Sequence, residues 1–340
     1  LRVLLVADTH LGFDLPSHPR VARRRRGHDF FDNFERALEP ARLGQVDVVV
    51  HGGDLLFRSR VPAWLAEAAL APLKRVASAG VPVLLVLGNH ERARLPYPLL
   101  ALHEGLHVFE RPRTVVLEVR GLRVAFVGFP YTRHIRERFA DVLASAAREA
   151  GQADLRVLCM HQCVEGATCG PGQFTFRRGP EVIPAGDLPR DVAVTLCGHI
   201  HRHQVLRHPG RPPVVYAGSV ERTSFAEAPE TKGYVVLDLA RAGLGGFRFH
   251  PLPARPMVTR TLSLDGAGPA EVLARVAAAI DSTPGDAVLQ VRLVGAVPAG
   301  LTAEALRALG GARNVTLAAD PTRERSRFHS RTDRAHAWYT

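Results

Sequence analysis

Short apolar runs alternate with longer amphipathic segments along most of the chain. Runs rich in valine and leucine at 2–7, 46–50 and 81–87 have the length and composition of buried strands. Between the first two runs, Phe30, Phe34 and Leu38 recur every four residues, the spacing of one helical face. Strands that are apolar on both faces and alternate with helices predict an α/β protein whose strands are covered on both sides.

The same pattern continues to about residue 254. A helix is expected between Pro62 and Gly80, because proline favours the first turn of a helix and glycine its end. Further strands are expected at 115–119, 123–129, 155–160, 193–197, 214–217 and 234–239, with a helix near 133–149. The stretch 162–190 is rich in glycine and proline, and we expect it to be a long ordered loop of the functional kind.

The pattern of expected strands and helices changes after the proline-containing run 251–256. Expected strands at 257–264, 288–294 and 314–318 then alternate with expected helices at 269–280 and 302–309. Within 288–294 apolar and polar residues alternate, as on a sheet with one solvated face. We therefore expect a large domain over 1–254, a small α+β domain over 255–320 and a flexible arginine-rich tail over 321–340.

Composition adds charge to this picture. The 44 lysines and arginines exceed the 33 acidic residues, and the net charge of +11 favours a polyanionic partner. Only Lys74 and Lys232 are lysines, an arginine bias that also follows genomic GC content, so charge alone points weakly to nucleic acid. The apolar runs are shorter than the ~18 residues of a membrane helix, and the first residues do not resemble a signal peptide. Four cysteines without a C-x-x-C pair indicate reduced thiols, so we expect a cytoplasmic bacterial protein without a membrane partner.

Five polar clusters follow predicted strands, at the edge where open α/β sheets bind their ligands. They are Asp8-Thr9-His10, Gly52-Gly53-Asp54, Gly88-Asn89-His90-Glu91, Met160-His161 and Gly198-His199-Ile200-His201. Their carboxylate, amide and imidazole groups suit Mn²⁺, Fe²⁺ or Zn²⁺ at mixed nitrogen and oxygen sites, and they contain no thiolate for a structural zinc. Each cluster alone is more often a cap or a turn, whereas the series predicts a metal site.

The number of ligands indicates two metal ions. Seven ligands with one bridging carboxylate fill two four-ligand sites, and two ions ~3.5–4 Å apart can polarise a hydroxide and hold a phosphoryl group. Asp8 and His10 are alternate residues of a segment expected to be extended, so their side chains should point to the same side, and His199 and His201 share this spacing. The glycine before each of Asp54, Asn89 and His199 should permit sharp turns.

In series, D-x-H, G-D, G-N-H-[DE], H and G-H-x-H resemble the calcineurin-like metallophosphoesterase superfamily over residues 1–250. Three segments are similar to the SbcD-type DNA repair nuclease branch of this superfamily. They are Asp8-Thr9-His10-Leu11-Gly12, the arginine-rich segment before Phe30-Phe31, and Tyr216-Ala217-Gly218-Ser219-Val220-Glu221-Arg222-Thr223-Ser224-Phe225. The resemblance implies a two-sheet sandwich flanked by helices (α/β/β/α), with the small domain as a cap that contacts DNA. It also implies a two-metal nuclease that cleaves backbone phosphodiesters by attack of metal-bound hydroxide, in the processing of DNA ends during double-strand-break repair or recombination.

The resemblance also implies a role for each residue. Asp8, His10 and His201 would hold one ion, Asn89, His161 and His199 would hold the other, and Asp54 would bridge them. The catalytic residue His90 would stabilise charge on the phosphate and help to protonate the leaving oxygen, with Glu91 as its orienting partner. The family prefers Mn²⁺ over Mg²⁺, Fe²⁺ or Zn²⁺. The implied partners are DNA, an SbcC-type coiled-coil ATPase and a second copy of the chain.

Two further features concern the substrate: one difference from the family pattern and one group of arginines. Phe57 stands three residues after Asp54, where archaeal and eukaryotic members carry a histidine, which leaves the balance of exonuclease and endonuclease action open. Arginines near the expected crevice should contact DNA phosphates. They are Arg20, Arg23, Arg24, Arg25 and Arg26 before the first helix, and Arg177 and Arg178 in the long loop.

Two alternatives remain from the sequence. The first is a metallophosphoesterase for nucleotides or other small phosphoesters, against which the net charge and the second domain argue. The second is a DNA-end-binding scaffold with structural metals, against which the full ligand set and His90 argue.

Overall fold

The computed structural model describes residues 1–15, 26–91, 94–148, 151–310 and 314–319. These residues belong to two compact units. The first comprises 1–15, 27–222 and 229–253, and the second comprises residue 26, residues 223–228 and the described residues from 254 onward. Across the described residues, no helix is both long enough and apolar enough to cross a membrane. All four cysteines are free and buried.

The first unit contains two six-stranded sheets. In spatial order, the first sheet consists of β16 (Gly243–Pro251), β15 (Gly233–Ala240), β1 (Arg2–Val6), β2 (Val48–His51), β3 (Val83–Val86) and β4 (Leu106–Phe109). The second consists of β13 (Gln204–Leu206), β14 (Val214–Tyr216), β12 (Val194–Gly198), β7 (Leu155–His161), β6 (Leu122–Gly128) and β5 (Arg113–Val119). Strands β1 to β4 are parallel to one another, as are β6, β7, β12 and β14. In the first sheet β15 is antiparallel to both of its neighbours, β1 and β16, and in the second sheet the two edge strands, β13 and β5, are antiparallel to their neighbours.

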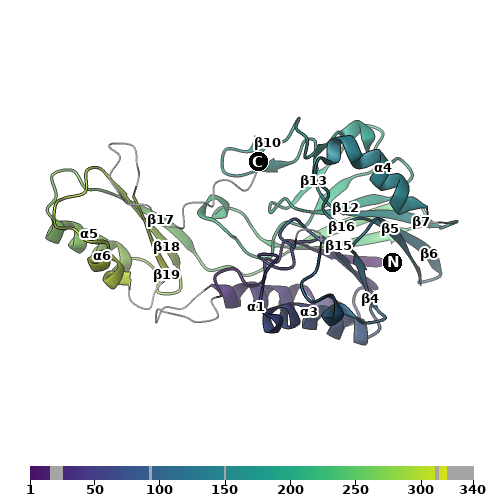
Figure 1. Cartoon of the computed structure of the whole chain (residues 1–340), viewed down its shortest axis with the longest axis horizontal. Helices are drawn as coiled ribbons and strands as arrows, with labels where there is room; N and C mark the ends of the chain where they lie inside the picture. Colours follow the sequence, from purple (N-terminus) through teal and green to yellow (C-terminus); the bar gives the residue numbers. More distant parts are fainter. Residues whose placement is uncertain (16–25, 92–93, 149–150, 311–313, 320–340) are drawn as a thin grey trace. The chain divides into compact units, whose positions relative to one another are not determined.

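Helices cover the outer face of each sheet (Figure 1). On the first sheet they are α1 (Gly27–Ala37), α2 (Glu39–Arg42), α3 (Ala63–Ser78) and the short 3-10 helix η1 (Pro98–Ala101). On the second it is α4 (Ile135–Ala147). The short 3-10 helix η2 (Ala185–Asp187) also belongs to this unit. Two small ladders complete this unit, β8 (Cys163–Val164) with β11 (Val182–Ile183) and β9 (Thr168–Cys169) with β10 (Phe174–Thr175).

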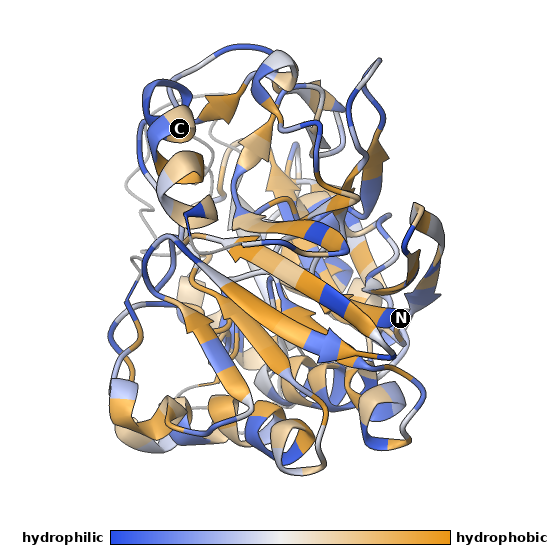
Figure 2. Ribbon diagram, turned by 90° about the vertical axis from the view of Figure 1, so that its right-hand side faces the viewer, coloured by the Kyte–Doolittle hydropathy of each residue, from blue (hydrophilic) through white to orange (hydrophobic). Residues whose placement is uncertain are grey.

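The layering follows from the alternation of side chains along each strand. In β1, Val3 and Leu5 pack between the two sheets, while Leu4 and Val6 pack against the helices. Because successive residues of a strand face opposite ways, a central strand must be apolar throughout. The strands are accordingly orange along most of their length in Figure 2, while the surface helices carry both colours. The order of layers is therefore helix, sheet, sheet, helix, which confirms the α/β/β/α sandwich.

Helix α3 shows how local sequence sets an element's bounds. Pro62 is its N-cap, and Gly80, just past its end, has a φ of +85° that a side chain would resist. Leu65, Leu73 and Val76 are buried along one face and pack into the core below the first sheet. The predicted start and end of this helix are confirmed.

The second unit contains one parallel three-stranded sheet, β17 (Met257–Ser263), β18 (Val288–Val294) and β19 (Asn314–Ala319). Helices α5 (Pro269–Asp281) and α6 (Ala303–Gly310) lie on one side of it (Figure 1), and the 3-10 helix η3 (Phe225–Glu227) belongs to the same unit. Leu289, Val291 and Leu293 join the core with these helices, whereas Arg292 is exposed. The predicted alternation in this strand is confirmed.

Three strands of the two six-stranded sheets were not expected from the sequence. They are β4, β13 and β16. Strand β16 carries Gly243, Gly245 and Gly246, which interrupt the apolar pattern of a strand. The stretch 162–190, expected to be a loop, contains the four two-residue strands of the small ladders. The predicted tail 321–340 lies outside the described residues.

Candidate metal centre

All eight predicted metal and catalytic residues lie in the first unit, at the carboxyl ends of its parallel strands. Asp8 and His10 follow β1, Asp54 follows β2, and Asn89 and His90 follow β3. In the second sheet, His161 is the last residue of β7, and His199 and His201 follow β12. The carboxyl ends of parallel strands share one edge, so residues up to 193 positions apart meet at a single site.

The backbone at this edge is not extended. Asp8, His10 and Asp54 have φ values of +51°, +44° and +52°, in the left-handed region. The expectation that Asp8 and His10 lie on an extended segment is therefore wrong, although their side chains do reach the same site. Their main chain is held instead by hydrogen bonds from Asp8 N to Gly53 O (2.9 Å) and from His10 N to Asp54 O (3.0 Å). Left-handed backbone costs about 1–2 kcal/mol for a non-glycine residue and persists where the surroundings impose it.

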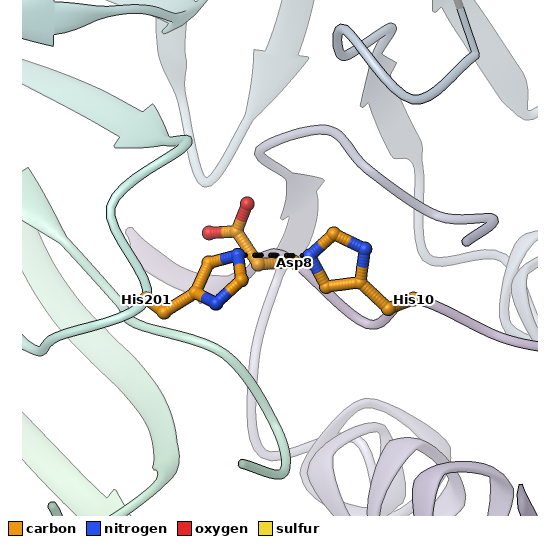
Figure 3. A group of neighbouring side chains, drawn as sticks. All are labelled: Asp8, His10 and His201. Atoms are coloured by element: carbon orange, nitrogen blue, oxygen red, sulfur yellow. Dashed lines mark hydrogen bonds between the residues drawn. The ribbon is translucent and has the colours of Figure 1, made fainter. Parts of the chain in front are cut away.

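The first set of ligand atoms, here called the Asp8 group, consists of Asp8, His10 and His201. One ligand atom from each residue lies within 4.8 Å of the others. The two Nε2 atoms of the histidines are 2.9 Å apart, and the Asp8 carboxylate faces the space beside them (Figure 3). Two imidazoles and a carboxylate facing one another form a donor set for a divalent transition metal.

The second set, the Asn89 group, consists of Asn89, His161 and His199. The Asn89 Oδ1 atom lies 3.0 Å from His161 Nε2 and 3.0 Å from His199 Nδ1. His161 Nδ1 donates a hydrogen bond to Gly52 O (2.8 Å), which leaves Nε2 as the nitrogen directed into the site. A ligand imidazole is typically fixed in this way by a carbonyl behind it.

Asp54 lies between the two groups. Its Oδ2 atom is 3.3 Å from His161 Nε2 and 3.9 Å from His10 Nε2, one nitrogen from each group. Its other oxygen, Oδ1, accepts a hydrogen bond from His90 N (2.9 Å). A Cβ atom on Gly88 would stand 2.0 Å from Oδ1, so the chain needs glycine at this close approach.

The electrostatics of the centre are organised around positive charge. Burial opposes ionisation of Asp54, but His161, His90 and His10 hold its pKa well below the usual 3.8. Burial would lower the pKa of His161, yet Asp54 and Asp8 raise it to about 9. Burial raises the pKa of Asp8, and burial together with His161 lowers the pKa of His199 to about 3. Without a metal ion, His161 therefore carries a proton beside the anionic Asp54 carboxylate, and a bound cation would take the place of that proton.

His90 and Glu91 differ from the expected arrangement. His90 Nδ1 donates to Phe57 O (2.6 Å), which directs Nε2 toward Asp54 Oδ2 at 3.9 Å. The Glu91 carboxylate accepts hydrogen bonds from Leu56 N (2.6 Å) and Gly88 N (2.9 Å). The Phe57 carbonyl thus holds the His90 ring, while Glu91 binds the main chain next to Phe57 and next to Asn89. Burial raises the pKa of Glu91 to about 8, and its carboxylate ties together the loops that follow β2 and β3.

The sequence interpretation missed Tyr131 and the role of His51. The Tyr131 ring lies 5.7 Å from that of His199, and its hydroxyl donates to Glu181 Oε2 (3.2 Å). Tyr131 follows β6, and the rule that identified the metal motifs after their strands could have found it. His51 is fully buried, and its Nε2 atom lies 3.1 Å from the hydroxyl of Thr9, between two ligands of the Asp8 group.

The predicted DNA-contacting arginines divide into three sets. Arg177 and Arg178 are exposed, as a phosphate contact requires. Arg26 is only 7% exposed, so the expected contact of this side chain with DNA does not fit. Arg20, Arg23, Arg24 and Arg25 lie outside the described residues.

Comparison with known proteins places these motifs in a family. The chain is 32% identical over 269 residues to the DNA double-strand break repair protein Mre11 of Methanosarcina mazei, covering 78% of this chain and 40% of that protein. It is 31% identical over 267 residues to the protein of the same name from Haloferax volcanii, covering 78% and 55%. It is 26% identical over 265 residues to the SbcD component of the SbcCD nuclease of Bacillus subtilis, covering 70% and 66%. The chain thus spans less than two thirds of each of these relatives. Residues 1–203, which contain every ligand of both groups, match the calcineurin-like phosphoesterase family, and the chain belongs to this family.

Proposed function

We propose that this chain is a two-metal-dependent DNA nuclease similar to SbcD, which hydrolyses backbone phosphodiesters in the processing of broken DNA ends. The observation that carries the proposal is the placement of Asp54 Oδ2 between a nitrogen of the Asp8 group and a nitrogen of the Asn89 group. Two divalent ions held by these groups would supply a polarised water and positive charge for the phosphate oxygens. Mn²⁺ is the preferred ion in this proposal.

The residues around the ligands have separate tasks in the reaction. The Phe57 carbonyl holds the proton on His90 Nδ1, so His90 Nε2 is the atom that exchanges a proton with the substrate. A proton carried on Nε2 would stabilise charge on the phosphate and pass to the leaving oxygen. Tyr131 borders the Asn89 group through its ring contact with His199, and its hydroxyl is held by Glu181.

DNA is favoured over a small phosphoester for two reasons. The relatives named above are a DNA repair protein and a component of a nuclease. The chain carries a net charge of +11, and Arg177 and Arg178 are exposed in the same unit as the metal centre. The protein partners included in the proposal are an SbcC-type coiled-coil ATPase and a second copy of the chain.

The test is incubation with Mn²⁺ and end-labelled duplex or single-stranded DNA, with bis(p-nitrophenyl) phosphate as a small diester. We expect DNA cleavage that disappears with chelator. His90→Ala should lower the rate constant by roughly 10²–10⁴-fold, the usual contribution of a general acid, without loss of DNA affinity. Turnover of the small diester without any cleavage of DNA would refute the nuclease and support the small-phosphoester alternative. DNA binding without hydrolysis of either substrate would support the scaffold.

The basic surface can be tested with a matched pair of double variants. Arg177→Ala with Arg178→Ala should raise KM for DNA and leave the turnover of the small diester unchanged. Arg2→Ala with Arg241→Ala removes the same charge from exposed positions, and Arg2 lies at the amino end of β1, the end opposite to the ligands. Equal effects of the two double variants on KM would show that only net charge matters.

A further inference from the structure

Lys232 is an exception in this chain. It is one of only two lysines among 44 basic residues, and its side chain is 1% exposed. It precedes β15, in the first unit, and its own carbonyl accepts a hydrogen bond from Leu252 N (2.8 Å). A buried ammonium group is costly unless it is paired and hydrogen-bonded, so its partners indicate why it is there.

One of these partners is the main chain of a metal ligand. Lys232 Nζ donates to the carbonyl oxygen of His201 at 2.8 Å. The same oxygen accepts a hydrogen bond from Ser219 N at 3.0 Å. His201 lies in the turn between β12 and β13, where no strand partner fixes its backbone. Two donors on one carbonyl therefore fix the peptide from which the His201 ring reaches His10.

The other partner connects this point to the β9–β10 hairpin. Lys232 Nζ also donates to Glu230 Oε2 (2.8 Å), and Glu230 Oε1 accepts from Arg202 Nε (3.0 Å). Arg202 in turn donates to Gly170 O (2.6 Å), in the turn of the hairpin. Gln204 binds the hairpin as well, through both the N–H and the carbonyl of Thr168.

The geometry suits lysine better than arginine. A tetrahedral ammonium can donate in separate directions to a carbonyl and to a carboxylate, whereas a guanidinium is larger and donates in one plane. The planar guanidinium suits the neighbouring position, where Arg202 donates both to Glu230 and to the hairpin.

We propose that Lys232 is a positioning residue that sets the metal affinity of the Asp8 group by fixing the main chain of His201. The inference rests on the proposed function only in that the Asp8 group holds a metal ion. Among the hydrogen bonds of the described residues, those that hold the Asn89 group are separate from this network: Gly52 O accepts from the His161 ring, and the Asp8 carboxylate accepts from His199 N. Lys232 therefore acts on one metal site of the two.

The test compares Lys232→Met with Lys74→Met by calorimetric titration of metal-free protein with Mn²⁺. Lys74 is the other lysine, and its Nζ contacts only Leu100 O (3.3 Å) among the hydrogen bonds of the described residues. We expect two sites in the wild type and in Lys74→Met. In Lys232→Met one site should bind about 10–100-fold more weakly, the usual effect of losing a partner behind a metal ligand, while the other keeps its affinity.

Several outcomes would overturn the proposal. It fails if both sites of Lys232→Met weaken equally, or if both keep wild-type affinity whatever happens to the thermal midpoint. If Lys232→Met does not fold, Lys232→Arg keeps the charge, and wild-type affinity at both of its sites would equally refute a positioning role. Arg202→Gln cuts the link to the hairpin but not the bond to His201, so weakening of one site by this variant would also contradict it.

Activity adds an independent measurement. If the wild type cleaves DNA, Lys232→Met should need roughly 10–100-fold more Mn²⁺ for half-maximal rate and should approach the wild-type kcat at saturating metal. A lower kcat at saturating Mn²⁺ with unchanged metal dependence would refute positioning through the metal. If the wild type cleaves no DNA, the proposed function fails, and the titration still decides the role of Lys232.

Discussion

The two groups of the candidate metal centre each have three side chains but differ in their support. In the Asn89 group, His161 is the last residue of β7, in register with Gly198 of β12, and Gly52 O fixes its ring. In the Asp8 group, Asp8 and His10 occupy left-handed backbone and His201 lies in a turn. The regular sheet thus places one residue of the Asn89 group, His161, whereas Asn89 lies in a turn and His199 has a φ of +87°. All three residues of the Asp8 group lie outside the strands.

This difference predicts which of the two groups loses its geometry more easily when a neighbouring residue is substituted. A strand end is held by ladder hydrogen bonds that many residues share, so one substitution nearby changes it little. Left-handed ligand residues and a turn carbonyl are each held by one or two contacts. We therefore expect the Asp8 group to be the more sensitive of the two to changes outside the ligands themselves.

Asp54→Asn should weaken metal binding by both groups and should have the largest effect on DNA cleavage of the variants discussed. The Asp54 carboxylate approaches His161 and His10, and loss of its charge weakens both metal sites at once. We expect loss of bound Mn²⁺ from both groups and at least a ~10³-fold fall in DNA cleavage, equivalent to about 4 kcal/mol. Metal content of the purified variant and single-turnover cleavage are the measurements.

A matched control for this variant is Asp47→Asn. Asp47 accepts a hydrogen bond from Arg2 N and pairs with Arg120, at the opposite ends of the strands. It should keep both metal ions and wild-type cleavage. Retention of one tightly bound ion in Asp54→Asn would show that Asp54 belongs to one group and does not bridge.

Asp8→Asn should weaken metal binding by the Asp8 group alone, and its effect should be smaller than that of Asp54→Asn. Burial raises the pKa of Asp8, so the charged carboxylate destabilises the metal-free fold at any pH above its folded-state pKa. Asparagine tolerates the φ of +51° and removes that charge, so the metal-free variant should be more stable by roughly 0.5–2 kcal/mol. Added Mn²⁺ should then stabilise it less than the wild type, because one site is lost.

Thermal unfolding with chelator and with Mn²⁺ measures both effects. A metal-free Asp8→Asn protein less stable than the metal-free wild type would contradict this account of the Asp8 group. An undiminished gain on adding Mn²⁺ would mean that Asp8 is not a ligand.

The order of elements and the residues of the candidate metal centre could be predicted from the sequence, because both depend on local patterns. Apolar runs predicted the central strands, and polar residues directly after them predicted where the site lies. The supports could not be predicted in this way. The contact of Lys232 with His201 spans 31 positions, and that of His90 with the Phe57 carbonyl involves a main-chain atom that any residue offers. Likewise, β16 carries three glycines and is a strand because β15 pairs with it.

Substitution of His51 should have the smallest effect on stability and on metal binding. His51 is the last residue of β2 and contacts the segment that carries Asp8 and His10. Its Nδ1 atom accepts a hydrogen bond from Gly53 N (3.2 Å), and Nε2 lies against Thr9, between Asp8 and His10. Burial lowers its pKa from 6.5 to about 3. The unfolded chain therefore binds a proton below pH 6.5 that the folded chain does not, and this contribution to stability is lost as the pH falls from 6.5 toward 3.

His51→Asn removes this titration while keeping a polar side chain beside Thr9. With chelator present, the free energy of unfolding of the wild type should fall more steeply between pH 6.5 and 5 than that of the variant. The difference in slope should approach one proton, about 1.4 kcal/mol per pH unit, measured by urea unfolding at each pH. Mn²⁺ titration of the variant at pH 7.5 should show weaker binding at one site only, because Thr9 belongs to the segment of the Asp8 group. Equal slopes would mean that His51 is not held neutral by the fold. Equal weakening of both sites would remove the expected difference in sensitivity between the Asp8 group and the Asn89 group.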